Sequence, residues 1–198
     1  MYVPEHFSPP DDAALVDLIR THPFGTIVTS DLQASHIPFL LEESKDGLVL
    51  HGHVAKANSH WQVFDGKAEA LVMFQGPDGY ISPSWGDCAE LVPTWNYMIV
   101  HAKGAPKLVE GRAAKTRLLH QMTERHEADR EAPWVMGDLA EGKLDQLLDA
   151  LVVFEMSVTR LEGKWKLSQN RDGATRGAFT HAVAAEGNEA LAAAMKQG

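Results

Sequence analysis

The stretch Gly47–Trp61, GLVLHGHVAKANSHW, constrains the fold most because its pattern changes part-way along. Apolar residues after a turn signal predict a β-strand at its start, and His51 and His53, two positions apart, share one face of that strand. The small, polar and basic residues of Ala55–Ser59 then predict the start of a helix. The free N–H groups and positive dipole end of such a helix, with Lys56 beside them, suit an anion. An ordinary strand–helix junction with a solvated lysine is the alternative.

Runs of β-branched and apolar residues elsewhere predict further strands, whose short links favour antiparallel pairing. The expected strands are Gly25–Ser30, Ser35–Leu41, Glu69–Gln75, Tyr80–Pro83, Thr94–Gly104 and Val152–Arg160. We expect Gly76–Gly79 to interrupt the strand and Glu162–Gly163 to form a turn. Pro38 cannot donate to a ladder, so it should mark an edge, a bulge, or a point where something other than a strand meets the backbone. Five or six such strands indicate a barrel or a sandwich, so the expected fold class is mainly β with peripheral helices (α+β).

Helices are expected where apolar residues recur at helical spacing. They are Ser8–His22, Gly111–Glu127, a stretch around Lys143–Leu151 and the alanine-rich tail Phe179–Met195. Ser8 is the predicted N-cap of the first helix. The chain shows no repeats and no low-complexity linker, so we expect a single domain over residues 1–198, with a helical insert at about 111–151 and a helical tail at about 176–197.

The composition is that of a globular protein with an acidic balance, with 198 residues, 44% hydrophobic and 23% charged, and a formal net charge of −9. This charge opposes broad attraction to nucleic acid or anionic membrane, because both need a basic face. The single cysteine, Cys88, cannot form an intrachain disulfide, and we expect a spare thiol in a loop. The N-terminus lacks a signal-peptide pattern and no apolar run approaches the ~18 residues of a membrane span, so a cytoplasmic location is expected.

Metal sites, hydrolase centres and nucleotide-binding loops lack support in this sequence. The sequence places no third ligand beside His51 and His53, and His120 and His126, six positions apart, lie on different sides of a helix. No Gly-x-Ser-x-Gly elbow, glycine-rich dinucleotide loop or Walker loop occurs, and Cys88 has no assigned base. We therefore expect no metal site, and any chemistry must come from a bound molecule.

Aromatic residues beside directional polar groups suggest a site for a planar ligand. The rings are Trp85, Trp95, Tyr97 and Trp165, and the polar neighbours are Thr94, Asn96, Lys166, Gln169, Asn170 and Arg171. Each ring alone is more often part of a core, where it buries a large apolar area. Together the two kinds of group suit a flat polar heteroaromatic with a phosphate tail, the phosphate lying on Lys56 and Asn58.

Phrases spread over nearly the whole chain resemble, in order, the PaiB family of FMN-binding negative transcriptional regulators. They are Tyr2–Phe7 (YVPEHF), Pro23–Thr29 (PFGTIVT), Ser35–Leu41 (SHIPFLL), Gly52–Asn58 (GHVAKAN), Phe74–Trp85 (FQGPDGYISPSW), Val92–His101 (VPTWNYMIVH) and Glu162–Arg171 (EGKWKLSQNR). The resemblance implies a split β-barrel of the flavin-reductase and pyridoxamine-phosphate-oxidase type. It also implies a homodimer that holds two FMN molecules at the subunit interface.

The resemblance to split-barrel flavoproteins also implies which residues hold FMN. The phosphate and ribityl chain should lie on the second and third strands and the helix start after them, at Ser35, His36, Pro38, His51, His53, Lys56 and Asn58. Residues late in the chain, often from the partner subunit, should reach the flavin ring, and here they are Trp95, Asn96, Lys166, Gln169, Asn170 and Arg171. A positive charge from Lys166 or Arg171 near the pyrimidine side of the ring favours the reduced, anionic flavin. No catalytic residue is assigned.

The resemblance favours a cytoplasmic FMN-binding regulator that responds to redox or metabolite state, and it makes DNA a candidate partner. The sequence itself shows no helix-turn-helix pattern. The second hypothesis is an FMN-dependent oxidoreductase that uses NAD(P)H or a small organic substrate. The third is a haem-binding or haem-degrading protein built on the same barrel. The sequence has no separate basic motif for a phosphorylated substrate, so the substrate and the existence of turnover stay open.

Overall fold

The computed structural model describes residues 1–86 and 90–197, and Cys88 lies outside the described residues. The chain forms two compact units. Unit 1 comprises Met1–His22, Met73–His101 and Leu161–Gly198, and unit 2 comprises Pro23–Val72 and Ala102–Arg160. Each unit is therefore assembled from separate stretches of the chain.

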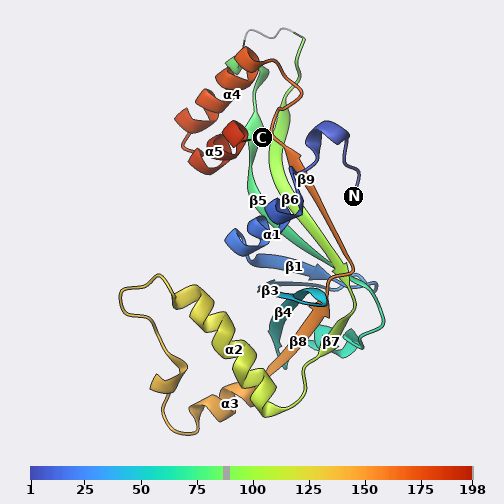
Figure 1. Ribbon diagram of the computed structural model, residues 1–198, viewed down its shortest axis with the longest axis vertical. Coiled ribbons are helices and arrows are strands. Elements are labelled where there is room, and N and C mark those ends of the chain that lie inside the picture. The colour runs from blue at the N-terminus through green and yellow to red at the C-terminus, as the bar shows by residue number, and fades with distance from the viewer. Residues whose placement is uncertain (87–89, 198) are drawn as a thin grey trace. The chain divides into compact units, whose positions relative to one another are not determined.

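The described strands form two sheets (Figure 1). The strands are β1 Phe24–Val28, β2 Ala34–Pro38, β3 Leu40–Ser44, β4 Gly47–Ala55, β5 Ala70–Ile81, β6 Thr94–Gly104, β7 Pro106–Leu108, β8 Leu151–Ser157 and β9 Arg160–Lys166. One sheet has five strands in the order β2-β1-β5-β6-β9, and the other has four in the order β3-β4-β8-β7. Strands β5 and β6 each run from one unit into the other. The expected class, mainly β with antiparallel sheets and peripheral helices, is confirmed.

The α-helices are α1 Asp12–Thr21, α2 Arg112–Glu127, α3 Lys143–Ala150, α4 Gly173–Ala185 and α5 Glu189–Gln197, with short 3-10 helices at Glu5–Phe7, Ser59–Val63, Pro83–Trp85 and Met136–Asp138. Helices α2 and α3 confirm two of the expected helical segments. The predicted N-cap Ser8 is wrong, because its N–H closes the preceding 3-10 turn on Glu5 O at 3.0 Å. Asp11 caps α1 instead, accepting from Ala14 N at 2.8 Å. Within the described ranges, no helix combines the length and the hydropathy that crossing a bilayer requires.

In unit 2, β1 and β2 form the expected antiparallel hairpin. The strand predicted over Ser35–Leu41 is wrong in one respect, because it divides at Phe39. Strand β2 lies at the edge of its sheet and ends at Pro38, in agreement with the missing proline N–H. The Phe39 N–H donates to Pro23 O at 2.8 Å, and β3 then pairs with β4 in the other sheet. The chain therefore changes sheets at one residue.

Strand β4 lies between β3 and β8 and confirms the strand predicted from Gly47. Gly52 lies against Phe154 of β8, where a Cβ atom would be 2.8 Å from the ring carbon Cζ. Phe154 also packs on Phe64, with 4.7 Å between ring centroids. The core of unit 2 is thus built where β4 and β8 meet.

The helix expected after this strand is present, but it is a short 3-10 helix that begins at Ser59. Ala55 still pairs with Leu151, and the Lys56 N–H donates to Ala150 O at 2.8 Å, so the chain follows the sheet this far. The next element is the five-residue 3-10 helix, for which Asn58 is the N-cap. A turn of this length lacks the aligned peptide dipoles of an α-helix start.

Unit 1 corrects two expected turns. Strand β5 continues through Gly76–Gly79, and Glu162–Gly163 lies inside β9. A Cβ atom at Gly79 would be 2.8 Å from Leu191 of α5. A glycine in β5 therefore lets a helix approach the strand closely instead of turning the chain.

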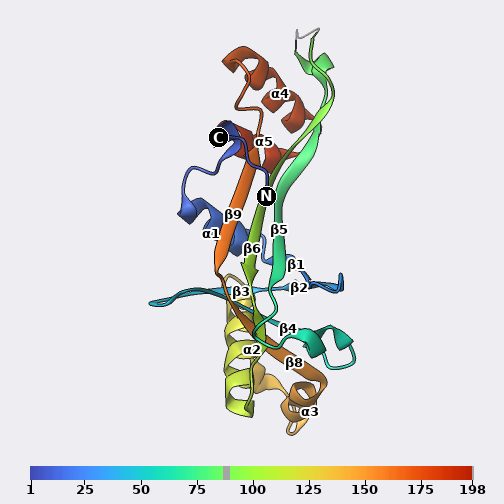
Figure 2. The ribbon, with the colours of Figure 1, turned by 90° about the vertical axis from the view of Figure 1, so that its right-hand side faces the viewer.

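The C-terminal tail forms two helices, α4 and α5, instead of the single helix expected. The break falls at Gly187, whose φ of 87° lies in the left-handed region that glycine adopts without strain. Asn188 Nδ2 donates to Asp78 O on β5 at 2.8 Å, which ties the start of α5 to the strand. Figure 2 shows α5 beside β5.

Candidate functional site

The residues expected to bind a cofactor fall into two groups, one in each unit. The unit 2 group is Ser35, His36, Pro38, His51, His53, Lys56 and Asn58. The unit 1 group is Trp95, Asn96, Lys166, Gln169, Asn170 and Arg171. Each unit therefore offers its own arrangement of polar side chains.

A chain of hydrogen bonds through His60 positions two members of the unit 2 group, Ser35 and Asn58. Asn58 Nδ2 donates to Ser35 Oγ at 3.1 Å, and Ser35 Oγ lies 2.8 Å from His60 Nδ1. On the other side of the ring, His60 Nε2 lies 2.8 Å from Thr29 Oγ1, which donates to Asp31 Oδ1 at 2.6 Å. Asn58 Oδ1 also accepts from His60 N at 3.0 Å. His60 is 1% exposed, so the centre of this chain is shielded from water.

The direction of these bonds assigns the tautomer of His60. The Thr29 hydroxyl donates its proton to Asp31, so its oxygen accepts from His60 Nε2–H. His60 Nδ1 is then the acceptor for the Ser35 hydroxyl, and Ser35 Oγ accepts from Asn58. Burial lowers the pKa of His60 from its usual 6.5, against an opposing effect of Asp31, which favours this neutral ring. The Ser35 hydroxyl proton is thus donated to His60 Nδ1, and the hydrogen bonds of Asn58 to Ser35 and His60 hold its amide in one orientation.

His51 and His53 on β4 each carry a buried ring nitrogen without a partner. His51 Nε2 lies 3.0 Å from Glu42 Oε2, whereas Nδ1 of His51 and Nδ1 of His53 reach no partner among the described residues. Desolvation lowers the pKa of His53, which favours its neutral form. In the part of the chain that the structure describes, no cluster of three His, Cys, Asp or Glu side chains could hold a metal ion. Hydroxyl groups of a ligand would satisfy both free nitrogens.

The remaining members of the unit 2 group lie nearer the surface. His36 Nδ1 lies 2.7 Å from Thr26 Oγ1 on the neighbouring strand, and Pro38 closes β2. Lys56 is exposed, and its ammonium group has no partner within the described chain. Because Asn58 is fixed two residues further on, this end of β4 offers a free cation beside an oriented amide.

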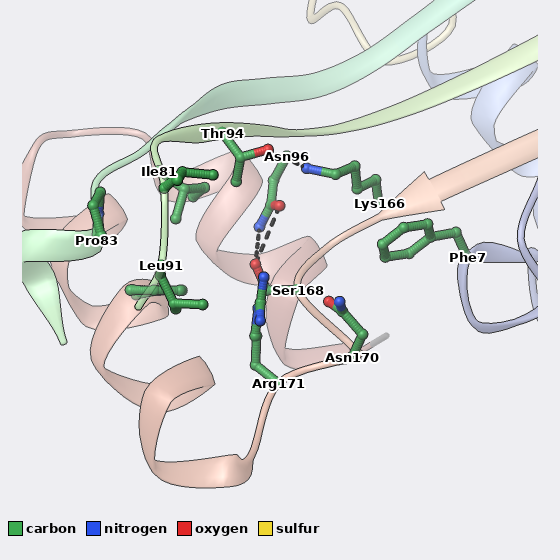
Figure 3. Close-up of a pocket in the computed structure, with 12 residues that line it drawn as sticks. Phe7, Ile81, Pro83, Leu91, Thr94, Asn96, Lys166, Ser168, Asn170 and Arg171 are labelled. Carbon is green, nitrogen blue, oxygen red and sulfur yellow. Dashed lines mark hydrogen bonds between the residues drawn. The ribbon is translucent and has the colours of Figure 1, made fainter. Parts of the chain in front are cut away.

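In unit 1, most of the expected residues line a small cavity between β6 and the turn after β9 (Figure 3). Its volume is about 120 Å³. The polar lining is Thr94, Asn96, Lys166, Ser168, Asn170 and Arg171, and the apolar lining is Phe7, Ile81, Pro83, Leu91, Val92 and Phe179. Sites for drug-sized ligands have volumes of about 300–1,000 Å³. This cavity therefore takes a ligand fragment or a small molecule, and it is too small for a three-ring flavin.

A tight turn at Ser168 positions the polar lining. Ser168 has a φ of 64°, which is unusual for a residue other than glycine, and its hydroxyl exchanges hydrogen bonds of 2.9 and 3.2 Å with the buried amide of Asn96. Gln169 closes the turn, since its Oε1 accepts from Leu167 N at 2.7 Å and its Nε2 donates to Trp165 O at 2.6 Å. Gln169 therefore holds the turn in shape and does not line the cavity.

Lys166 and Arg171 make the cavity positive. Lys166 Nζ donates to Thr94 Oγ1 at 2.6 Å and also to Trp95 O. Burial lowers the pKa of Lys166, and the charges of Lys164 and Arg171 lower it further. The Arg171 guanidinium finds no acceptor in the described part of the chain. An anion in the cavity would favour the charged form of Lys166 and give Arg171 a partner.

The four aromatic candidates do not share this cavity. Trp165 is 5% exposed and packs in the core, which is the alternative given for each of these rings. Trp95 is 54% exposed and packs against Tyr80, with 6.4 Å between ring centroids. Trp85 lies 6.3 Å from the same ring, and Tyr97 lines an open surface hollow together with Trp95.

Sequence reasoning missed two residues on which these arrangements depend, His60 and Ser168. His60 stands 31 positions from Thr29 and 25 from Ser35, and no local pattern connects residues so far apart. The left-handed conformation of Ser168 could not be predicted from the sequence either, because glycine and asparagine are the residues that usually indicate that conformation. The only local sign of His60 was its position two residues after a helix N-cap, Asn58.

Comparison with known proteins decides the family. A family model described as "Putative FMN-binding domain" matches residues 1–160. The chain belongs to this family. FMN, the cofactor implied by the resemblance, is thereby confirmed. The resemblance to PaiB is confirmed as well, because protease synthase and sporulation protein PAI 2 of Bacillus subtilis is 34% identical over 178 residues, which cover 87% of this chain and 84% of the relative.

Solved structures show the same fold. The flavocytochrome Anf3 from Azotobacter vinelandii matches with a TM-score of 0.60 at 14% identity, over 87% of this chain and 73% of that chain. The FAD and heme binding protein from Mycobacterium smegmatis matches with a TM-score of 0.59 at 17% identity, over 80% of this chain and 73% of that chain. At these identities the likeness shows the fold alone, and it confirms the antiparallel split β-barrel that we expected.

The described residues fit the chemistry of FMN. In unit 2, His51 and His53 carry buried nitrogens that lack a partner, and Lys56 carries a free ammonium group. In unit 1, Arg171 carries a free guanidinium. Ribityl hydroxyl groups, a phosphate and the polar edge of a flavin ring require partners of these kinds.

Proposed function

We propose that this protein acts as an FMN-binding homodimer that regulates transcription in response to redox or metabolite state. The family match supports FMN binding, and the resemblance to the PaiB family, with the Bacillus subtilis protease synthase and sporulation protein PAI 2 as a relative, supports a regulatory role. The observation that carries the proposal is the pair of unpartnered nitrogens on His51 and His53. Buried polar atoms are normally hydrogen-bonded, so two unpaired atoms on one strand face favour a ligand there.

The proposal assigns the ribityl chain and the phosphate to the unit 2 group. His51 and His53 accept hydrogen bonds from ribityl hydroxyl groups, and Lys56 and Asn58 contact the phosphate. Ser35 acts through Asn58, because its own proton is used on His60. His36 and Pro38 are assigned to the same ligand from β2.

The proposal assigns the flavin ring to the unit 1 group, which reaches the FMN bound by the other subunit of the dimer. The residues in this role are Trp95, Asn96, Lys166, Asn170 and Arg171, with Gln169 holding the turn that carries two of them. When bound, FMN supplies one- or two-electron chemistry. The ring would lie outside the cavity, which is too small for it, and the positive charges of Lys166 and Arg171 in the cavity would stabilise negative charge on the reduced ring.

A second candidate function is an FMN-dependent oxidoreductase, and the cavity of unit 1 favours it. The cavity provides room for a small ligand in addition to the flavin. If this function is correct, anaerobic mixing of the FMN-loaded protein with NADH or NADPH bleaches the flavin absorbance. Stable absorbance with both donors contradicts it.

FMN binding is tested with the full chain by absorbance and by flavin fluorescence titration. We expect a yellow protein in which Lys56→Ala weakens FMN affinity by ~1–3 kcal/mol, because the phosphate loses a charged partner. Lys67→Ala, which removes another exposed lysine of unit 2, is the control and should leave the affinity unchanged. A colourless protein that ignores added FMN overturns the proposal.

Regulation is tested by a gel-mobility shift with the DNA upstream of the protein's own gene. The assay is run at low salt, with oxidised FMN, with reduced FMN and without flavin. A shift that depends on the flavin state supports the regulatory role. A protein that leaves the DNA unshifted in all three states is not a direct repressor.

A further inference from the structure

The cavity of unit 1 has an unbalanced positive charge (Figure 3). Lys166 and Arg171 line it, and Lys164 is close enough to lower the pKa of Lys166. No Asp or Glu is among the described residues that line the cavity. Lys166 Nζ uses two of its three N–H groups on Thr94 and Trp95, and the Arg171 guanidinium has no described partner. Donors for an anion are therefore available.

The rest of the lining is apolar. Phe7, Ile81 and Phe179 are 8%, 1% and 3% exposed, and their side chains provide carbon surface without donors. We call these three residues the apolar wall. An ion that is charged on every side, such as phosphate, would bury polar oxygens against this wall without partners. A ligand with a carboxylate at one end and hydrocarbon at the other has both the charge and the apolar surface that the cavity matches.

The volume limits the length of such a ligand. A cavity of about 120 Å³ corresponds to roughly four water molecules at ~30 Å³ each. This leaves room for a carboxylate group and about three further carbon atoms. Long-chain acids and ring systems of flavin size are too large.

The polar side of the cavity is also held in place before any ligand arrives. Asn96 and Ser168 exchange hydrogen bonds, and Gln169 closes the turn that presents Asn170 and Arg171. The positive φ of Ser168 is the kind of constrained backbone that is found preferentially at binding sites. Binding then orders few additional groups, which favours a small ligand of limited contact area.

We propose that this cavity binds a short aliphatic monocarboxylate, with its carboxylate on Arg171 and Lys166 and its hydrocarbon end against the apolar wall. The anion is the metabolite that the flavoprotein senses or converts. This role rests on the proposed function, whereas the binding itself does not require the flavin.

The test is calorimetric titration of the FMN-saturated full chain with butyrate, at an ionic strength held constant with chloride. We expect Arg171→Gln to weaken butyrate binding about tenfold or more, because the carboxylate loses a charged donor pair. Arg171→Lys keeps the charge and should restore part of the affinity. Lys196→Gln removes an exposed lysine of α5 in the same unit, outside the cavity, and should change the affinity less than about twofold.

Two further ligands test the shape of the cavity. Inorganic phosphate and decanoate should each bind at least about tenfold more weakly than butyrate, the first because of the apolar wall and the second because of its length. Phosphate that binds more tightly than butyrate overturns the proposal. Butyrate that releases FMN also overturns it, because the cavity then belongs to the flavin. If the Arg171→Gln and Lys196→Gln variants bind butyrate with equal affinity, Arg171 does not hold the carboxylate, and the proposal is overturned as well.

Flavin absorbance, measured on the same samples, shows whether a negative result concerns the carboxylate site or the proposed FMN binding. A chain that never takes up FMN but binds butyrate through Arg171 contradicts the flavoprotein role and leaves the carboxylate site standing. A yellow protein that ignores butyrate contradicts only the carboxylate site. Circular dichroism of each variant shows that the fold is retained.

Discussion

His60 connects Ser35 and Asn58 of the unit 2 group to Thr29 and Asp31. Its two ring nitrogens bridge Thr29 and Ser35, so the orientation of Asn58 depends on Asp31, four hydrogen bonds away. Hydrogen bonds from Thr29 and Gln33 lower the pKa of Asp31 to about 2, and its carboxylate stays charged at any ordinary pH. The proposed phosphate contact at Asn58 is therefore supported by a residue that does not touch the ligand.

Replacing His60 should destabilise the protein and disturb Asn58 together. His60→Ala removes two hydrogen bonds from buried hydroxyl groups, and we expect the free energy of unfolding in urea to fall by about 1–3 kcal/mol. His126→Ala removes an exposed histidine of α2 and should change it by less than about 0.5 kcal/mol. Equal losses in the two variants would show that the chain through His60 contributes nothing.

The buried histidines also predict how stability depends on pH. Burial lowers the pKa of His53 and of His60 from 6.5, so below that pH the unfolded chain takes up protons that the folded chain does not. Stability contributed in this way is fully present above about pH 6.5 and is lost as the pH falls below it. Urea unfolding between about pH 7.5 and about pH 5 should show this decline, and His53→Gln should flatten it. A slope that the substitution leaves unchanged would refute the assignment.

Among the elements, β5 shows that glycine can allow close packing of a helix on a strand as well as a turn of the chain. Its Gly-Pro-Asp-Gly segment has the composition of a turn, yet it lies inside a strand. A Cβ atom at Gly76 would be 2.9 Å from Leu18, and one at Gly79 would be 2.8 Å from Leu191. The missing Cβ that permits a turn also permits a helix to approach a strand, and the sequence alone does not tell the two apart.

A glycine at the end of β6 gives the sharpest test of close approach. In Gly104→Ala the new Cβ atom would be 2.2 Å from the backbone oxygen of Ser157, and we expect a loss of about 3 kcal/mol of stability. Gly177→Ala lies within α4, where a Cβ atom meets nothing within 4 Å, and it should stabilise by about 0.5–1 kcal/mol. Thermal unfolding measures both. Shifts in the same direction would contradict this account of the strand glycines.

Elements set by local composition could be predicted, and elements set by distant contacts could not. The β-branched run of β6 and the helical spacing of α2 agree with the structure to within a residue. The division at Phe39 depends on its hydrogen bond to Pro23, sixteen positions away (39 − 23), which no local pattern shows. The same holds for the site. Residue types alone suggested Lys56, Asn58 and the unit 1 group, the family resemblance added the other proposed cofactor-binding residues, and His60 required the three-dimensional structure.

For the whole molecule, the proposed dimer and its flavin are linked. If FMN binds where two subunits meet, it favours association, and association favours FMN binding by the same factor. Sedimentation velocity should show a lower dimer dissociation constant with FMN than without it. Arg171→Gln should lose part of this shift and Lys196→Gln should keep it. A monomer–dimer distribution that FMN leaves unchanged would contradict a site shared between subunits.

The division of the chain has a consequence for biosynthesis. Residues 1–22 belong to the same unit as residues 161–198, so unit 1 is completed only after both stretches of unit 2 have been synthesised. A nascent chain stalled before residue 161 carries an unfinished unit 1, however long it waits. Neither unit corresponds to an uninterrupted piece of the gene, so a single contiguous exchange of sequence cannot replace one unit and leave the other intact.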